Sequence, residues 1–91
     1  MKYTIIRTSQ FKHDYKKALL RGIDVAKLKN IILMLANGEA LPEIYKDHAL
    51  VGKYQGYREC HIQSDLLLVY KISENELVLS LFRFGTHSDI F

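Results

Sequence analysis

Four side chains in the second half of the chain, three histidines and one aspartate, could carry out acid–base chemistry. They are His48, His61, Asp65 and His87. The ordinary pKa of histidine lies close to neutrality, so histidine readily serves as a general acid or base. Asp65 follows His61 by four positions across the turn at 62–64, and we expect these two side chains to lie close together. The remaining histidine, His13, stands among lysines, and we expect it on an exposed helix face.

Each of these residues also has a structural interpretation, which the sequence leaves open. A histidine near a strand end commonly packs or forms a hydrogen bond, and an aspartate such as Asp65 can stabilise a turn. His87 can be a solvated residue of the C-terminal tail. Metal binding by the four residues is conceivable, but their spacing matches no metal-binding motif, and the single cysteine, Cys60, has no thiol partner. We therefore predict neither a metal nor a cofactor.

The combination of these groups suits cleavage of RNA without a metal. In that reaction the ribose 2′-hydroxyl attacks the neighbouring phosphate. A base removes the hydroxyl proton, an acid protonates the departing 5′-oxygen, and a cation such as Arg83 stabilises the charge on the phosphate. Only RNA carries the 2′-hydroxyl, so a site of this kind would act on RNA and not on DNA.

Positive charge is concentrated in the first third of the chain. Residues 1–30 hold eight Lys and Arg against two acids, a net charge of +6, whereas residues 31–91 hold five against eight, a net charge of −3. Such an excess favours an anionic partner, nucleic acid first, although a solvated helix face is the simpler alternative. The residues expected to dock on such a partner are Lys12, Lys16, Lys17, Arg21, Lys27 and Lys29.

The first half of the chain predicts one strand and two helices. Residues 3–8 are rich in β-branched side chains and predict a strand, and Ser9 is placed to cap a helix that ends at Gly22. Asp24 is placed to cap a second helix that closes at 37–38. The apolar residues at helical spacing, expected on the buried faces, are Phe11, Tyr15, Ala18 and Leu19, then Val25, Leu28, Ile32 and Leu35.

The second half predicts an irregular segment followed by three strands. Residues 39–56 show no period, and strands are expected over 57–62, 66–72 and 77–84, with a tail from Thr86. The nearly continuous apolar run from Leu66 predicts a central strand that is covered on both faces. Alternation in the first of these strands places Tyr57, Glu59 and His61 on one face, and Arg58, Cys60 and Ile62 on the other.

The expected order is therefore β-α-α-β-β-β in a single domain over residues 1–91. Because the last three strands are joined by short turns, they must form an antiparallel meander, with the helical hairpin packed on one face. The fold class is α+β, with a mainly antiparallel sheet. Hydrophobic residues make up 48% and charged residues 25% of the chain, which excludes a disordered tail and a coiled coil. We find no export signal and no membrane span, and a lone cysteine is typical of the reducing cytosol, so we expect a cytoplasmic protein.

Several motifs of the second half occur together in the order and spacing of one family. They are Tyr45-Lys46-Asp47-His48-Ala49-Leu50, then Gly52, Gly56-Tyr57-Arg58-Glu59-Cys60-His61-Ile62, Asp65-Leu66-Leu67-Leu68-Val69-Tyr70, and Arg83-Phe84-Gly85-Thr86-His87 with Phe91. On these residues the chain resembles the YafQ branch of the RelE/ParE toxin superfamily. The first half agrees in element order and length but contains no diagnostic motif.

The resemblance implies a RelE-like fold and a bacterial type II toxin. Such a toxin is a small endoribonuclease, an mRNA interferase that cuts mRNA in the ribosomal A site and is silenced by a cognate antitoxin. Carried over by position, His87 would be the acid, and Asp65 with His61 would take or relay the 2′-hydroxyl proton. His48 would help as base or phosphate ligand, Arg83 would hold the scissile phosphate, and Phe91 could stack on a base.

One departure and two alternatives accompany this resemblance. The family often has an aromatic residue directly after the aspartate, and here that position is Leu66, so base preference cannot be carried over. ParE-type members of the superfamily share the element order but inhibit DNA gyrase without cleaving nucleic acid. Such an inhibitor has no need of the three histidines and the aspartate together. A non-catalytic RNA-binding or decayed toxin is the third interpretation.

Overall fold

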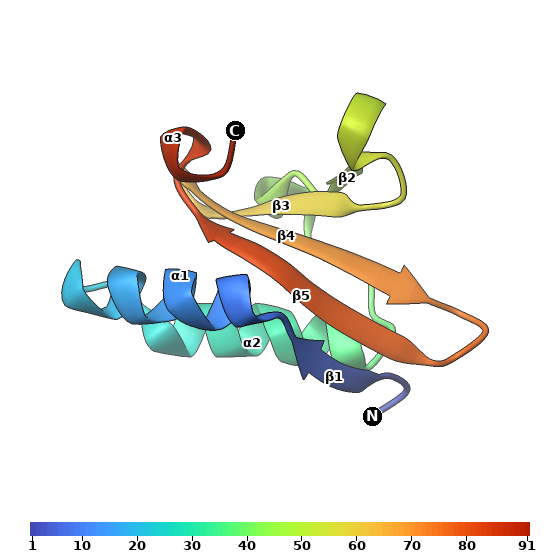
Figure 1. The fold of residues 1–91 in the computed structure, drawn as a ribbon. Coiled ribbons are helices and arrows are strands. Elements are labelled where there is room, and N and C mark those ends of the chain that lie inside the picture. Colours follow the sequence, from blue (N-terminus) through green and yellow to red (C-terminus); the bar gives the residue numbers. More distant parts are fainter.

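One five-stranded mixed sheet carries two long helices on one of its faces (Figure 1). The structure is a computed structural model that describes residues 1–91. The strands are β1 (Thr4–Arg7), β2 (His48–Ala49), β3 (Arg58–Gln63), β4 (Leu66–Ser73) and β5 (Val78–Gly85), and the helices are α1 (Ser9–Leu20), α2 (Val25–Ala36) and α3 (His87–Ile90). The strand order in the sheet is β1-β5-β4-β3-β2, so the last strand pairs with the first.

The antiparallel meander expected for the last three strands is confirmed. β3, β4 and β5 pair antiparallel in sequence order, and the first residues of β4, from Leu66 to Tyr70, are buried as predicted for a central strand. β1 joins the edge of β5 in the parallel direction, which makes the sheet mixed. Two irregularities interrupt the pairing: Ile62 is the extra residue on β3 and Phe82 the extra residue on β5.

The helical hairpin is also confirmed, with two local corrections. Thr8, and not Ser9, caps α1: its hydroxyl accepts the Phe11 N–H at 2.9 Å and donates to the Phe82 carbonyl at 2.8 Å. Leu19, expected on the buried face, is 44% exposed, because the last turn of α1 extends beyond the sheet that covers the earlier turns. Asp24 caps α2 as predicted, by accepting the Lys27 N–H at 3.2 Å.

The buried face of α2 is also slightly rotated from the predicted one. Ile31 is buried there in place of Ile32, which lies half-buried against the same core. The adjacent Ile31 and Ile32 lie about 100° apart around the helix axis, so a small rotation changes which of the two is buried.

The segment over 39–56, expected to be irregular, contains short elements. Two 3-10 turns, Glu43–Tyr45 and Gly52–Tyr54, lie on either side of β2, which pairs His48 with Glu59 and Ala49 with Arg58. The expected tail also contains a helix, α3, which Thr86 caps. A strand of two residues and a helix of four are too short to give a periodic signal, so the sequence pattern could not reveal them.

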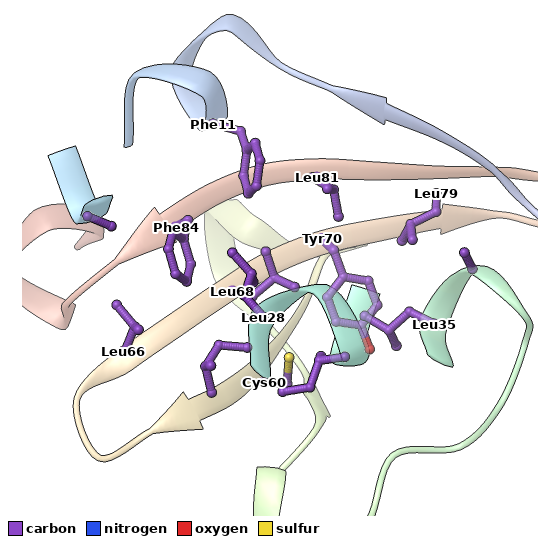
Figure 2. Packing of buried hydrophobic residues seen from close by; sticks show 14 of the residues in the cluster. Phe11, Leu28, Leu35, Cys60, Leu66, Leu68, Tyr70, Leu79, Leu81 and Phe84 are labelled. Carbon is purple, nitrogen blue, oxygen red and sulfur yellow. The ribbon is translucent and has the colours of Figure 1, made fainter. Parts of the chain in front are cut away.

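The two faces of the sheet have different cores. The larger core lies between the sheet and the helices, and Figure 2 shows Phe11, Leu28, Leu68 and Phe84 packed there. A smaller cluster of Leu67, Val69 and Ile90 lies on the opposite face.

No helix of the structure has the length and apolar character needed to cross a membrane.

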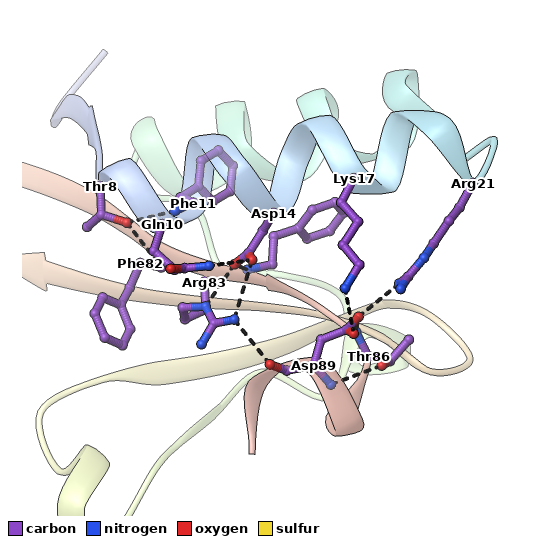
Figure 3. A network of polar contacts seen from close by, with 11 residues as sticks. Thr8, Gln10, Phe11, Asp14, Lys17, Arg21, Phe82, Arg83, Thr86 and Asp89 are labelled. Atoms are coloured by element: carbon purple, nitrogen blue, oxygen red, sulfur yellow. Dashed lines mark hydrogen bonds and ion pairs between the residues drawn. The ribbon is translucent and has the colours of Figure 1, made fainter.

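A buried carboxylate fixes α1 to β5. Asp14 is only 6% exposed and accepts hydrogen bonds from Arg83 Nε at 2.8 Å, from the Phe84 N–H at 3.0 Å and from Gln10 at 3.0 Å (Figure 3). Burial alone raises the pKa of Asp14, but these donors together outweigh it and hold the pKa below its ordinary value. Ionised Asp14 therefore stabilises the fold.

We predict that Asp14→Asn lowers the free energy of unfolding by about 3 kcal/mol at pH 7, because the half-buried Arg83 loses its charge partner. Since the folded-state pKa of Asp14 is lowered, its contribution is complete above the ordinary carboxyl pKa of about 4 and fades as pH falls through the folded value. The difference between the variant and the parent should therefore shrink in urea unfolding measured from pH 7 to pH 3. The control is Asp24→Asn, in which Asn caps α2 as well as Asp does. A difference that is the same at both ends of this pH range would contradict the prediction.

Candidate active site

Three imidazole rings lie in a row where β2, β3 and α3 meet. His61 on β3 is in the middle: its ring centroid is 6.2 Å from that of His48 and 6.3 Å from that of His87. The pairing of β2 with β3 brings His48 beside this strand, and α3 brings His87 back from the end of β5. Three of the four side chains predicted for acid–base chemistry are thus brought together, and Asp65 joins them through His87.

A buried carboxylate lies between the first two rings. The Glu59 side chain is 5% exposed, and its Oε1 is 3.7 Å from Nε2 of His48 and 3.5 Å from Nε2 of His61. Strand alternation placed Glu59 on the same face as His61, but its place in the site was not predicted. The signal was present in the pattern, since residues two apart on a strand share a face. The pattern could not show that His48 lies beside Glu59, because the two residues are on different strands.

The ring of His48 is fixed by a backbone carbonyl. Nδ1 of His48 lies 2.6 Å from the Lys46 carbonyl oxygen, so the proton on Nδ1 is donated there and Nε2 faces Glu59. Lys46 itself has φ 49°, in the left-handed region that non-glycine residues seldom adopt. Such backbone strain is concentrated at functional sites, and here it aims a carbonyl at the first ring of the row.

Asp65 forms its hydrogen bonds with His87 and not with His61. Its Oδ1 lies 3.1 Å from Nδ1 of His87 and accepts the His87 backbone N–H at 3.4 Å. These hydrogen bonds, the side-chain one above all, lower the pKa of the Asp65 carboxyl. No hydrogen bond or ion pair joins Asp65 to His61, and the shared role expected for these two residues stays a prediction. His61 precedes the Ile62 bulge, and its ring lies between those of His48 and His87, whereas Asp65 accepts from the first residue of α3.

Arg83 contacts none of the histidines through a hydrogen bond or an ion pair. Its Nε and Nη2 donate to Asp14, and Nη2 also donates to the Asp89 carbonyl oxygen at 3.1 Å. A guanidinium has five N–H donors, of which three are used in this way. The side chain is 20% exposed, which leaves the two donors of Nη1 as the ones that could reach a phosphate.

Phe91 extends the row of rings at the C-terminus. Its ring is half-exposed, lies 5.9 Å from the His87 ring, and meets Tyr54 edge to face at 5.1 Å. Tyr54 lies in the segment over 39–56, which shows no periodic pattern of apolar residues, so the sequence did not indicate it. Leu66, where the family often has an aromatic residue, packs in the helix-covered core and contributes nothing to this surface.

An open groove adjoins the middle ring. It has a volume of about 410 Å³, and it lies between His61 on one side and the first 3-10 turn on the other. Its lining includes Tyr45 and two lysines, Lys27 and Lys46. A groove with an aromatic ring and positive charge beside an imidazole suits a nucleotide.

The predicted docking residues do not form one uniform face. Lys12, Lys16 and Lys29 are exposed and have no partner, and Lys27 lies over the ring of Tyr45 at 5.7 Å. Lys17 and Arg21, by contrast, point to Asp89 of α3. His13 is exposed on α1, as predicted.

Neither thiol chemistry nor a metal ligand set is evident in the chain. Burial raises the pKa of the Cys60 thiol to about 12, so the thiolate that acts as a nucleophile is scarce at neutral pH. No three side chains among the His, Cys, Asp and Glu residues are grouped in a way that could hold a metal ion. The groups arranged for chemistry are therefore the imidazoles and their two carboxylates.

Comparison with known proteins identifies the family. The model of a family described as a bacterial toxin of the type II toxin-antitoxin system, YafQ, matches residues 3–91. The mRNA interferase toxin YafQ of Escherichia coli K12 is 39% identical over 85 residues, which cover 92% of this chain and 90% of that protein. A metal-bound toxin from Helicobacter pylori matches with a TM-score of 0.92 and 40% identity over 98% of this chain and 99% of that one.

A chain in the crystal structure of the E. coli DinJ–YafQ complex matches with a TM-score of 0.89 and 38% identity, over 98% of both chains. The likeness thus extends over both halves of the chain, including the basic helices, in which the sequence held no diagnostic motif. The chain belongs to the YafQ family of bacterial type II toxins.

Proposed function

We propose that this toxin is an endoribonuclease that cleaves mRNA in the ribosomal A site, in the cytoplasm. The observation that carries the proposal is the row of three imidazoles about 6 Å apart, with a buried carboxylate between two of them and an exposed carboxylate on the third. A gyrase inhibitor needs no such row. The name of the E. coli relative, an mRNA interferase, supports the same activity.

His48 is the general base in this mechanism. With the Nδ1 proton donated to the Lys46 carbonyl, its Nε2 is free to take the proton of the 2′-hydroxyl as the oxygen attacks phosphorus. The imidazolium that forms then lies 3.7 Å from the Glu59 carboxylate, which stabilises its charge. In a Ser-His-Asp triad one aspartate both fixes the tautomer at Nδ1 and stabilises the imidazolium; here the Lys46 carbonyl does the first and the Glu59 carboxylate, near Nε2, does the second.

His87 is the general acid. Asp65 accepts from Nδ1 of His87, which orients the ring and leaves Nε2 to protonate the 5′-oxygen as the phosphorus–oxygen bond breaks. Asp65 is therefore an orienting group for the acid in this mechanism, and the transfer of the 2′-hydroxyl proton is assigned to His48. Base and acid stand at the two ends of the row, as in-line displacement requires.

The scissile phosphate lies between them, over His61. The ring of His61 lies between those of His48 and His87, so an imidazole N–H there can donate to a phosphate oxygen. The two free donors of Arg83 Nη1 supply further positive charge. The flanking nucleotides lie in the groove beside His61 and against the exposed ring of Phe91, where a base can stack.

The lysines of the helical hairpin dock the toxin on ribosomal RNA. Lys12, Lys16 and Lys29 have no acidic partner in the chain and can each meet a phosphate, while Lys27 combines with Tyr45 at the groove. Binding of this kind acts through release of counterions and weakens as salt rises.

A cognate antitoxin holds the toxin silent. This part of the proposal rests on the DinJ–YafQ complex of E. coli, whose matching chain shares the fold over nearly its whole length. The net charge of +6 on residues 1–30 suits an acidic partner protein as well as RNA.

We predict that His87→Ala lowers the rate of mRNA cleavage by about 10²–10⁴-fold, the usual contribution of a general acid, and abolishes growth arrest on expression. The side chain is exposed, so the variant should fold like the parent. The matched control is His13→Ala, which removes an exposed histidine of α1 and should leave cleavage unchanged. A soluble, folded His87→Ala protein with undiminished cleavage would overturn the assignment. A parent protein that binds ribosomes but never cuts RNA would instead support the non-catalytic interpretation.

We also predict that Glu59→Gln lowers kcat by about tenfold or more, because the neutral amide cannot stabilise the imidazolium of His48; the orienting carboxylate of a serine protease contributes up to about 10⁴-fold. The change is isosteric, and CD-monitored unfolding should show an intact fold. Glu76→Gln, in the exposed turn before β5, is the control. Equal kcat for Glu59→Gln and the parent would assign Glu59 a packing role only.

A further inference from the structure

The helix that carries His87 is too short to be stable alone. α3 spans four residues, and isolated helices shorter than about 12 residues are marginal in water. Two local features support it: the capping box between Thr86 and Asp89, and Ile90, which is buried against the sheet. Neither of them fixes the position of α3 against α1, and Asp65 can orient the His87 ring only where α3 is held in place.

The first helix reaches α3 through the carboxylate of Asp89. Nη1 of Arg21 lies 2.9 Å from Asp89 Oδ2, and Nζ of Lys17 lies 3.5 Å from Oδ1 (Figure 3). Positions 17 and 21 are one turn apart, so the two side chains leave the same face of α1. The hydrogen bond from Arg21 holds the pKa of the Asp89 carboxyl well below its usual range.

Two further contacts join the same elements. Nη2 of Arg83 donates to the Asp89 carbonyl oxygen, and this guanidinium is itself held by Asp14 of α1. Gly85, at the end of β5, allows α3 to fold back closely, because a Cβ there would lie 2.9 Å from Asp89 Oδ2. Lys17 and Arg21 of α1 therefore contact the side chain of Asp89, and Arg83 of β5 contacts its backbone carbonyl.

We propose that Lys17 and Arg21 are positioning residues, which act through Asp89 to hold α3 so that His87 and Phe91 face the substrate. The catalytic consequence rests on the proposed function of His87. The assignment separates these two cations from Lys12 and Lys16, which are exposed on the same helix without an acidic partner. Positive charge on α1 thus has two roles: part of it is available to RNA, and part of it is used within the molecule.

The test compares two double variants that remove the same charge from the same helix, Lys17→Gln with Arg21→Gln, and Lys12→Gln with Lys16→Gln. Amide exchange is measured by NMR for Ile90 and Phe91, whose N–H groups donate to carbonyls of Thr86 and His87. We expect exchange about three- to tenfold faster in the first variant only, as suits exposed ion pairs of modest strength. Added salt should reduce this difference, since it screens the pairs in the parent. A variant with Arg21→Lys in place of Arg21→Gln keeps this positive charge and should restore most of the protection of these amides from exchange.

The same variants are then compared in mRNA cleavage on ribosomes. The Lys12/Lys16 variant should raise KM, because it removes docking charge, whereas the Lys17/Arg21 variant should lower kcat by about three- to tenfold. Equal exchange rates at α3 in the two variants would overturn the proposal. So would faster exchange with an unchanged kcat, or a Lys17/Arg21 variant that changes KM alone. If the parent does not cleave RNA, the proposed function fails while the exchange experiment still decides whether Lys17 and Arg21 hold α3.

Discussion

The Asp14 carboxylate is the contact on which the arrangement of the molecule depends. It joins the first helix to the last strand, accepting from Arg83 and from the Phe84 backbone N–H in a buried position. Without it, a guanidinium and an amide would lose their partners inside the protein, and each loss is costly because water cannot replace them there. The position of α1 against the end of β5, and through it that of α3, is therefore set by one ionised side chain of the first helix.

The Phe82 bulge on β5 lies beside the polar groups that Thr8 and Asp14 satisfy, and a second bulge lies on β3. On β5, Leu79, Leu81 and Phe84 all lie in the helix-covered core, so the spacing of the buried residues changes from two to three at Phe82. The Thr8 hydroxyl satisfies the Phe82 carbonyl at this point. The Ile62 bulge on β3 directly follows His61. Bulges redirect side chains, and here each lies next to a residue of the site, at the cost of local polar groups that other elements must satisfy.

The sequence predicted the parts of the molecule that repeat with a period, and it failed where contacts are long-range. Helical spacing and strand alternation identified α1, α2 and the meander, and the motifs identified the three histidines. Glu59 could have been found, because it shares a strand face with His61, whereas nothing local marked Tyr54. The hydrogen bond between Asp65 and His87, 22 residues away, could not be predicted, because distance along the chain is not distance in space. For the same reason, counting charges could not separate Lys17 and Arg21 from Lys12 and Lys16.

One face of the sheet provides most of the stability of the fold, and the other face carries the candidate site. The face under the helices buries a large apolar core, and its polar groups, such as Asp14, are fully paired. The other face has a small apolar cluster, and beside it a carboxylate is buried between two imidazoles at 3.5 and 3.7 Å, too far for strong hydrogen bonds. Burying Glu59 in this way costs stability, which the opposite core supplies. In the mechanism proposed here the weak contacts are useful, because the carboxylate gains a full charge partner only when His48 takes up a proton, as the 2′-hydroxyl attacks.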